Sequence, residues 1–337
     1  MFGGFLDGTF ARACNELYLL SLQRYEDEHA LLRWNRIAVP ARRGSDKSLR
    51  PRGLHAAAVV RSSNVLYVFG GISNSQSISN FDSLRLNDMD AGWTDVAARA
   101  NGRPPAARYG CTMTPLQSGK LIVVGGCNGA DFFHEGTELP SPYIFDTEQN
   151  TWSQVSVSGP PVHRRCHVAE FIAGHLVILG GFRRSGGSIQ FDAGSEPMLM
   201  REVRHGHWSV SMQKVQESRA QPAQRFGHAS SSWGGQIVIC GGWAEDTRRA
   251  VADVYALDFC PGLSEPLREN IADKVGRAQT QLHSAEADSI HADERFLETR
   301  SAWAFQLLHF VVLLPGLALM ILYQLFMSPV NKAMGRK

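Results

Sequence analysis

The sequence predicts an all-β fold built from repeated units of about four short strands each. Three observations support this prediction: recurring diglycines, recurring tryptophans, and short apolar runs between them. The runs at 66–69, 121–124 and 176–179 are rich in β-branched residues, which is typical of strands buried on both faces. With 44% hydrophobic and 20% charged residues, the composition indicates a globular protein and excludes a disordered or collagen-like chain.

A diglycine ends the second predicted strand of each unit. The last four diglycines start 55, 55 and 61 residues apart. The ten residues are Gly3, Gly4, Gly70, Gly71, Gly125, Gly126, Gly180, Gly181, Gly241 and Gly242. Glycine suits a strand end where the backbone needs a positive φ or approaches another segment closely. We expect one of these two situations at each diglycine.

Two further markers keep a fixed order around the diglycines. An arginine element precedes each of the last four by 15 to 18 residues, and it begins at Arg52, Arg108, Arg165 and Arg225. A tryptophan follows in the first four units, with spacings of 59, 59 and 56 residues, at Trp34, Trp93, Trp152 and Trp208. Such a bulky side chain suits the space between neighbouring sheets. Several markers repeated in fixed order indicate a repeat architecture.

This order of markers resembles the kelch repeat, whose units are four-stranded blades of a β-propeller. The resemblance covers residues 1–260 and implies about five blades, of which the first and last are incomplete. The first unit begins at its second strand, and the fifth has no tryptophan-led fourth strand. Two interpretations remain open: a small five-bladed closure, or an N-terminally truncated product of a larger kelch protein.

The C-terminal part has a different character. Residues 302–326 are apolar and uncharged, and about 20 apolar residues suffice to span a bilayer. We expect a helical stalk at 261–300, a transmembrane helix at 301–327 and a short basic tail at 328–337. The stalk has an interrupted heptad pattern, so a solvated helix and a dimeric coiled coil are both open for it.

The position of this hydrophobic segment predicts a single-pass, tail-anchored membrane protein with a cytosolic propeller. The first 20 residues lack the basic and apolar regions of a signal peptide. Six scattered cysteines show neither a disulfide framework nor a zinc pattern. The endoplasmic reticulum and the mitochondrial outer membrane both remain open as locations.

Arginine dominates the basic residues, with 28 Arg against 6 Lys. Many arginines fall in the loops that gather on one face of a propeller, where rigid blades present variable loops. Because guanidinium groups bind carboxylates in a bidentate manner, we expect an arginine-rich face that binds an acidic segment of a protein partner. The candidate residues are Arg183, Arg184, Arg248, Arg249, Arg52, Arg108, Arg165 and Arg225. The alternative for the last four is a structural role, because they occupy the repeat's own framework position.

A propeller enzyme is the alternative function, such as a metal-dependent oxidase, a lyase or a sugar epimerase. We expect no enzyme and no cofactor, because the sequence has no recognisable catalytic motif or metal-ligand spacing. The histidines His55, His167 and His228 recur at one repeat position, which indicates a scaffold role. The net charge of +2 also argues against a nucleic-acid partner.

Overall fold

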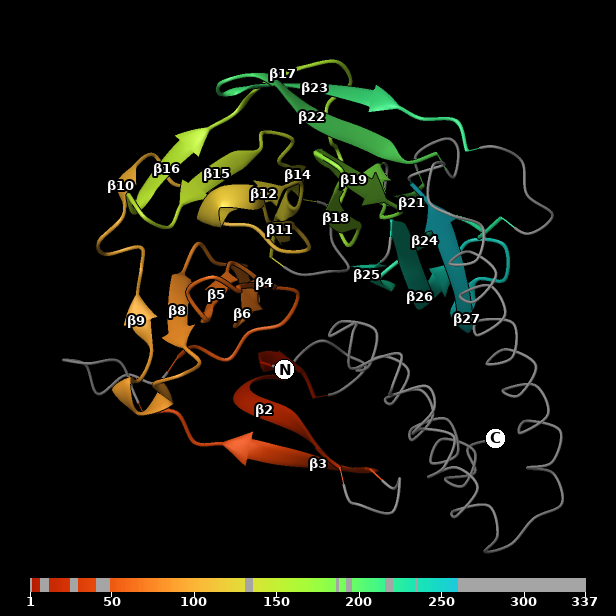
Figure 1. The fold of residues 1–337 in the computed structure, drawn as a ribbon. Coiled ribbons are helices and arrows are strands. Elements are labelled where there is room, and N and C mark those ends of the chain that lie inside the picture. Colours follow the sequence, from red (N-terminus) through yellow and green to blue (C-terminus); the bar gives the residue numbers. More distant parts are fainter. Residues whose placement is uncertain are drawn as a thin grey trace, which may run out of the picture. The chain divides into compact units, whose positions relative to one another are not determined.

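The computed structural model describes residues 2–6, 12–24, 30–40, 49–130, 136–185, 188–191, 196–215, 221–233 and 235–259. The chain divides into two compact units, Met1–Val215 and Gln216–Lys337. Unit 1 contains four large β-sheets in an arc, which we call blades I to IV (Figure 1). Unit 2 contains one, which we call blade V. The predicted all-β architecture of five blades is therefore confirmed.

Blades II, III and IV each contain the predicted four strands in antiparallel order. Blade II consists of β4 (Ala56–Val60), β5 (Val65–Phe69), β8 (Phe81–Arg85) and β9 (Thr94–Asp95). Blade III consists of β11 (Thr112–Pro115), β12 (Lys120–Val124), β15 (Tyr143–Asp146) and β16 (Thr151–Gln154). Blade IV consists of β18 (Val168–Ile172), β19 (His175–Leu179), β22 (Met198–Arg204) and β23 (His207–Met212).

Blades III and IV also carry a fifth strand that the sequence did not predict. The linker into each blade pairs in parallel with the outermost strand: β10 (Asn101–Gly102) with β16, and β17 (Ser156–Ser158) with β23. These strands are two and three residues long and have no alternating pattern to reveal them. They cover the outer edges of these two blades.

The first and last blades are incomplete, as predicted. Blade I has three strands, β1 (Phe2–Phe5), β2 (Ala13–Arg24) and β3 (Ala30–Ile37). Blade V consists of β25 (Ala229–Trp233), β26 (Gln236–Ala244) and β27 (Arg249–Asp258), with the short β24 (Arg225–Phe226) paired to β26. Among the described residues, blade I has no first strand and blade V has no fourth.

Small hairpins connect the second and third strands of blades II to IV. They are β6 (Ile72–Ser73) with β7 (Gln76–Ser77), β13 (Cys127–Asn128) with β14 (Thr137–Glu138), and β20 (Arg183–Ser185) with β21 (Ser188–Gln190). The described residues also include two 3₁₀ turns, at Met89–Ala91 and Gln117–Gly119.

Aromatic side chains fill the space between adjacent blades of unit 1. Trp152 of blade III lies 5.8 and 5.0 Å, between ring centroids, from Phe69 and Phe81 of blade II. Trp93 of blade II lies 5.0 Å from Phe2 of blade I. Burying a large apolar side chain stabilises a fold by roughly 1.5–3 kcal/mol, so these contacts hold the blades side by side. The predicted role of tryptophan between sheets is confirmed here.

Trp34 departs from this pattern. It is 40% exposed, whereas Trp93, Trp152 and Trp208 are between 2% and 4% exposed. The physical reason is that each buried tryptophan faces the preceding blade, and among the described residues of unit 1 no blade precedes blade I. Trp34 therefore occupies the repeat position without the contact that usually buries it.

All ten diglycine residues have a positive φ, as expected. Gly70 and Gly71 also show the predicted close approach. A Cβ atom on Gly70 would lie 2.4 Å from the carbonyl oxygen of Arg108, and one on Gly71 would lie 2.7 Å from that of Gly53. No side chain fits these distances, so two constraints require glycine at the same place.

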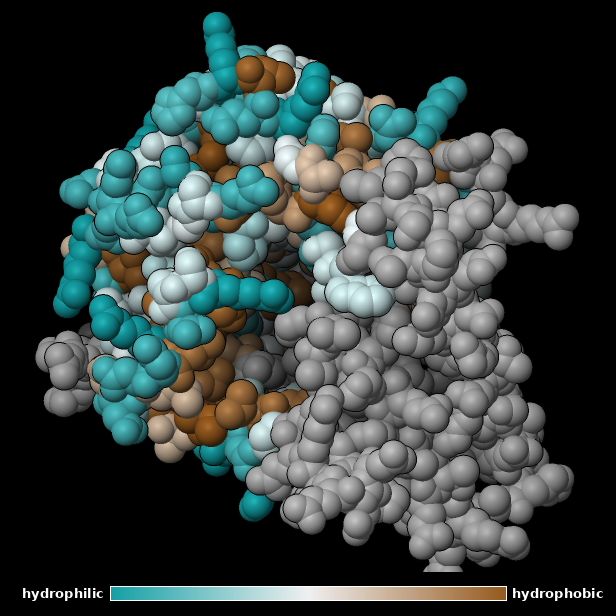
Figure 2. Space-filling view, viewed as in Figure 1, coloured by the Kyte–Doolittle hydropathy of each residue, from teal (hydrophilic) through white to brown (hydrophobic). Residues whose placement is uncertain are grey.

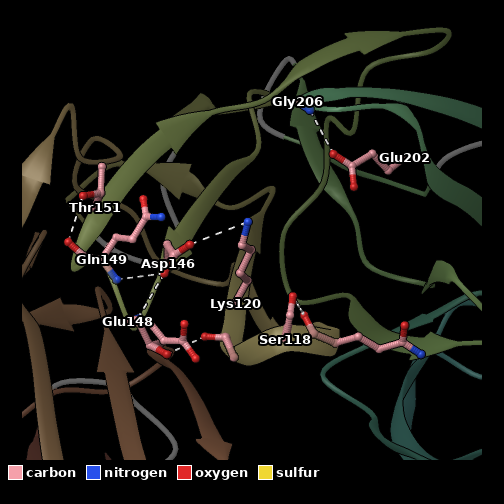
Figure 3. Close-up of polar contacts among 11 residues, drawn as sticks. Ser118, Lys120, Asp146, Glu148, Gln149, Thr151, Glu202 and Gly206 are labelled. Atoms are coloured by element: carbon pink, nitrogen blue, oxygen red, sulfur yellow. Dashed lines mark hydrogen bonds and ion pairs between the residues drawn. The ribbon is translucent and has the colours of Figure 1, made fainter.

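A side-chain cap orders the turn between β15 and β16. The Asp146 carboxylate accepts hydrogen bonds from the backbone N–H groups of Glu148 and Gln149, at 3.0 and 2.9 Å (Figure 3). It also lies 3.6 Å from Nζ of Lys120. The hydrogen bond from Gln149 is the main cause that lowers the pKa of Asp146. This turn positions Trp152 at the start of the fourth strand.

The predicted stalk, membrane helix and tail at 261–337 lie outside the described residues. Within the described part of the chain, no helix has the length and apolar character needed to cross a membrane.

Candidate functional site

Three of the predicted arginines form part of the propeller framework. Nη1 of Arg52, Arg108 and Arg225 donates to the carbonyl oxygen of the first glycine of the same blade's diglycine, at 3.4, 2.9 and 3.1 Å. Nε of each donates to the carbonyl oxygen two residues earlier. All three are at most 3% exposed. Their guanidinium groups thus bond the blade itself, in line with the structural alternative.

Two of these three arginines pair with an aspartate, and the third stacks over a tyrosine ring. Arg52 pairs with Asp82 at 3.0 Å, and both side chains are fully buried. Arg225 makes two hydrogen bonds to the carboxylate of Asp253. Arg108 stacks over the ring of Tyr143, 5.6 Å from the centroid, and burial lowers the pKa of its guanidinium.

The fourth framework residue is Arg164, one residue before the predicted Arg165. Nη1 of Arg164 donates to the carbonyl oxygen of Gly180 at 3.0 Å, as its counterparts do in other blades. The register prediction for this unit was therefore wrong by one residue. Each framework arginine lies three residues before a histidine or cysteine, and the Arg-Arg doublet hid this spacing, which would have selected Arg164 before His167.

Arg165 occupies the next repeat position, held by Gly53, Tyr109 and Phe226 in the other units. The bridges Tyr109–Cys127 and Arg165–Phe182 show this equivalence. The Arg165 side chain is fully buried, lies 4.9 Å from the ring centroid of Phe182 and donates to the hydroxyl of Tyr109. Nε lies 3.6 Å from the carboxylate of Glu138. Arg165 is thus enclosed by aromatic rings and one carboxylate.

Cys127 and Cys166 lie close to Arg165, and Cys111 lies close to Arg108. Burial raises the pKa of Cys111 to about 11 and that of Cys166 to about 12, and it also raises the pKa of Cys127. Protonated thiols are poor nucleophiles and poor metal ligands. The described residues contain no group of three or more His, Cys, Asp or Glu side chains arranged to hold a metal ion.

The small hairpins of unit 1 form a surface that we call the hairpin face (β6–β7, β13–β14 and β20–β21). The first two hairpins bond to each other: Oγ of Ser77 donates to the carbonyl oxygen of Gly129 at 2.6 Å. Arg183 and Arg184 lie on β20 of this face. Arg183 is exposed and Arg184 is half-buried.

Arg248 and Arg249 lie in unit 2, at the turn between β26 and β27. Both side chains are exposed, and neither has a hydrogen bond or ion pair to the described residues. Trp243, close to them on β26, is 42% exposed and stacks on Phe226 with 6.5 Å between ring centroids. Trp243 directly follows a diglycine but is not among the residues predicted from the sequence.

Comparison with known proteins agrees with this geometry. Residues 1–192 match the family model described as KLHDC2/KLHL20/DRC7 Kelch-repeats domain. The chain is 29% identical over 205 residues to Adagio-like protein 1 of Oryza sativa subsp. japonica, which covers 58% of this chain and 29% of that protein. It is 26% identical over 254 residues to Multiple epidermal growth factor-like domains protein 8 of Homo sapiens. That match covers 67% of this chain and 9% of that protein.

A third relative is the Rab9 effector protein with kelch motifs of Danio rerio, 29% identical over 120 residues, which covers 34% of this chain and 33% of that protein. The chain thus spans about a third or less of the length of these relatives. The repeated blades and the family match together define a β-propeller of the kelch class. The chain belongs to the kelch-repeat family.

Proposed function

We propose that this kelch propeller is a scaffold that binds an acidic segment of a protein partner through arginines that lie outside its framework. One observation carries the proposal: the arginines divide into two groups. The framework group donates hydrogen bonds to carbonyl oxygens inside the blades and consists of Arg52, Arg108, Arg164 and Arg225. The loop group, Arg183, Arg184, Arg248 and Arg249, lies outside the framework.

The loop group suits a carboxylate-rich partner. A guanidinium binds a carboxylate with two parallel hydrogen bonds, and the side chains of Arg183, Arg248 and Arg249 are exposed. Loops on rigid sheets are also where repeat folds place binding residues. One relative is named as an effector of another protein, Rab9, which supports a protein-binding role here. This function includes no catalytic step and no cofactor.

The proposal is tested by charge reversal on the two loop pairs. Proximity labelling with the full chain first identifies partners. Their capture is then measured with R183E/R184E, with R248E/R249E and with the control R61E/R85E. Arg61 and Arg85 are exposed and lie at the opposite end of blade II from its hairpin. We expect capture to fall at least tenfold in a loop variant, with an unchanged thermal melt. Equal capture by all four proteins would overturn the proposal.

We also propose that residues 302–326 anchor the chain in a membrane, with the propeller in the cytosol. The support is the length and apolar character of this uncharged segment. Deleting 302–326 should move the full chain from the membrane fraction to the soluble fraction. Imaging a tagged 262–337 segment should show the endoplasmic reticulum or the mitochondrial surface. A diffuse distribution would contradict the anchor.

A further inference from the structure

The unit of blade IV buries two successive arginines, Arg164 and Arg165. Arg164 makes the framework bond to the carbonyl oxygen of Gly180, so the framework of this blade is complete without its neighbour. The other units hold an uncharged residue at the position of Arg165, namely Gly53, Tyr109 or Phe226. Burying a cation costs free energy, even where an ion pair compensates part of it. The fold of the blade alone therefore does not account for Arg165.

The surroundings of Arg165 connect two blades. Figure 2 shows the hydrophilic side chains of unit 1 mostly along its outer rim and the hydrophobic ones mostly further inside, and the fully buried Arg165 departs from this distribution. Its guanidinium carbon lies 5.4 Å from the ring centroid of Tyr109 and 4.9 Å from that of Phe182. Its Nε lies 3.6 Å from Oε1 of Glu138. Tyr109 and Glu138 belong to the unit of blade III, whereas Phe182 belongs to that of blade IV.

Phe182 is the residue directly before the loop pair Arg183 and Arg184. Its backbone N–H donates to the carbonyl oxygen of Arg165 at 3.0 Å, and its carbonyl oxygen accepts from the N–H of Arg165 at 2.9 Å. Arg165 thus contacts Phe182 through both the backbone and the side chain. Successive side chains of an extended segment point to opposite sides. Because Phe182 is fully buried, Arg183 points outward, in agreement with its exposure.

The hairpin that carries the loop pair is short. Strands β20 and β21 pair over three residues each, from Arg183 opposite Gln190 to Ser185 opposite Ser188. A two-stranded hairpin of this size is marginally stable by itself, so its direction depends on how it is attached to the blades. Phe182 provides one such attachment, at the start of β20.

A second set of contacts extends this attachment across the hairpin face. Ser77 and Gly129 join β6–β7 to β13–β14 by three hydrogen bonds of 2.6 to 3.2 Å. Glu138 lies on β14, and through Arg165 it links the same hairpin to Phe182. The three hairpins are therefore connected in series from blade II to blade IV, and Arg165 forms the last link.

We propose that Arg165 is a positioning residue for the loop pair: by holding Phe182 against the unit of blade III, it sets the direction in which Arg183 and Arg184 meet the carboxylates of a partner. Binding groups that are already ordered lose less conformational freedom when the partner arrives, so the affinity is higher. This role rests on the proposed function, because it requires that the loop pair binds an acidic segment. Arg165 then acts from behind the binding surface and does not touch the partner.

Hydrogen exchange on the full chain tests whether Arg165 holds the hairpin. The R165M variant keeps an unbranched apolar side chain but loses the guanidinium group. We expect the amides of β20 and β21 to exchange at least tenfold faster in R165M, whereas those of β18 and β19 should change less than twofold. Equal acceleration throughout blade IV, or none in the hairpin, would overturn the proposal.

Binding of a fluorescein-labelled peptide of ten glutamates separates positioning from stability. Measured below the melting temperature, R165M should weaken binding at least fivefold. The control R108M removes a framework arginine of blade III, so it should lower the melting temperature but bind the peptide within twofold of the wild type. In the R183E/R184E background, R165M should cause no further loss, because a residue that acts only through the loop pair has no effect once that pair is gone.

The outcomes distinguish this role from the proposed function. If R183E/R184E weakened binding but R165M did not, the positioning role would be overturned and the proposed function would stand. A further fivefold loss from R165M in the R183E/R184E background would have the same meaning, since Arg165 would then act independently of the pair. Unchanged binding by R183E/R184E would overturn the proposed function at this pair, and the role of Arg165 with it.

Discussion

The backbone N–H of Gly71 in blade II donates a hydrogen bond of 2.9 Å to the carbonyl oxygen of Arg108 in blade III. The side chain of Arg108 in turn bonds the carbonyl oxygen of Gly125, the first glycine of its own blade. One arginine therefore joins two diglycines in successive blades. Gly4 and Gly126 make the same backbone bond to Arg52 and Arg164, so unit 1 repeats this link at each blade junction.

The G70A variant tests this junction. Its Cβ would lie 2.4 Å from the carbonyl oxygen of Arg108, at φ +67. Backbone strain and the clash should together lower the free energy of unfolding by about 2–4 kcal/mol. The control is G174A, which has φ +77 but no atom within 4 Å of the added Cβ, and should lose about 1 kcal/mol. Denaturant unfolding measures the free energy of unfolding of both variants. If G70A and G174A lost the same amount, the close approach of Gly70 to Arg108 would not explain the need for glycine.

A second prediction concerns the stability that the buried ion pair Arg52–Asp82 contributes to the fold. R52M leaves the Asp82 carboxylate buried without its charge partner and should lower the free energy of unfolding by about 3–5 kcal/mol. The double variant R52M/D82L removes both charges and should lose clearly less than R52M alone. A double-mutant cycle in denaturant checks this order. If the double variant were the less stable of the two, the pair would not be the main reason for burying Arg52.

His228 predicts a pH dependence in blade V. Burial is the main cause that lowers its pKa to about 3, and the positive charge of Arg225 adds to it. The unfolded side chain has a pKa near 6.5, so below that pH the unfolded state binds a proton that the folded state does not. This contribution to stability is complete above pH 6.5 and decreases as the pH falls towards 3. Between pH 7 and pH 5 the loss should be about 2 kcal/mol.

Hydrogen exchange on β25, β26 and β27 at pH 7 and pH 5 measures this effect in unit 2. The H228L variant has no titrating group at this position, so its stability should depend less on pH over the same range. An unchanged pH dependence in H228L would show that another group is responsible.

Much of the fold could be predicted because the repeat markers carry backbone and packing constraints. Gly70 and Gly71 are required by positive φ and close contact, and Trp152 by the space between sheets, so their spacing reveals the blades. The short parallel strands β10 and β17 could not be predicted, because they depend on backbone pairing alone. Trp34 occupies the repeat position of the buried tryptophans but is itself exposed. Its burial could not be predicted from the repeat pattern, because it depends on the presence of a neighbouring blade.

The candidate site was predicted less completely. Sequence spacing located the framework arginines, and the three-residue spacing to His167, which the Arg-Arg doublet hides, distinguishes Arg164 from Arg165. It could not show that Arg165 is enclosed by Tyr109, Phe182 and Glu138, because these residues come from three different blade segments.

The division of the arginines is tested most directly by comparing R108M with R183E/R184E and R248E/R249E in two measurements on the full chain, thermal melting and capture of the labelled partners. We expect opposite effects. R108M should lower the melting temperature by several degrees because it removes a framework bond, whereas the loop variants should melt normally and lose capture. The division of the arginines into framework and binding groups would be contradicted by loop variants with a lowered melting temperature. It would also be contradicted by loop variants that capture partners as well as the wild type does.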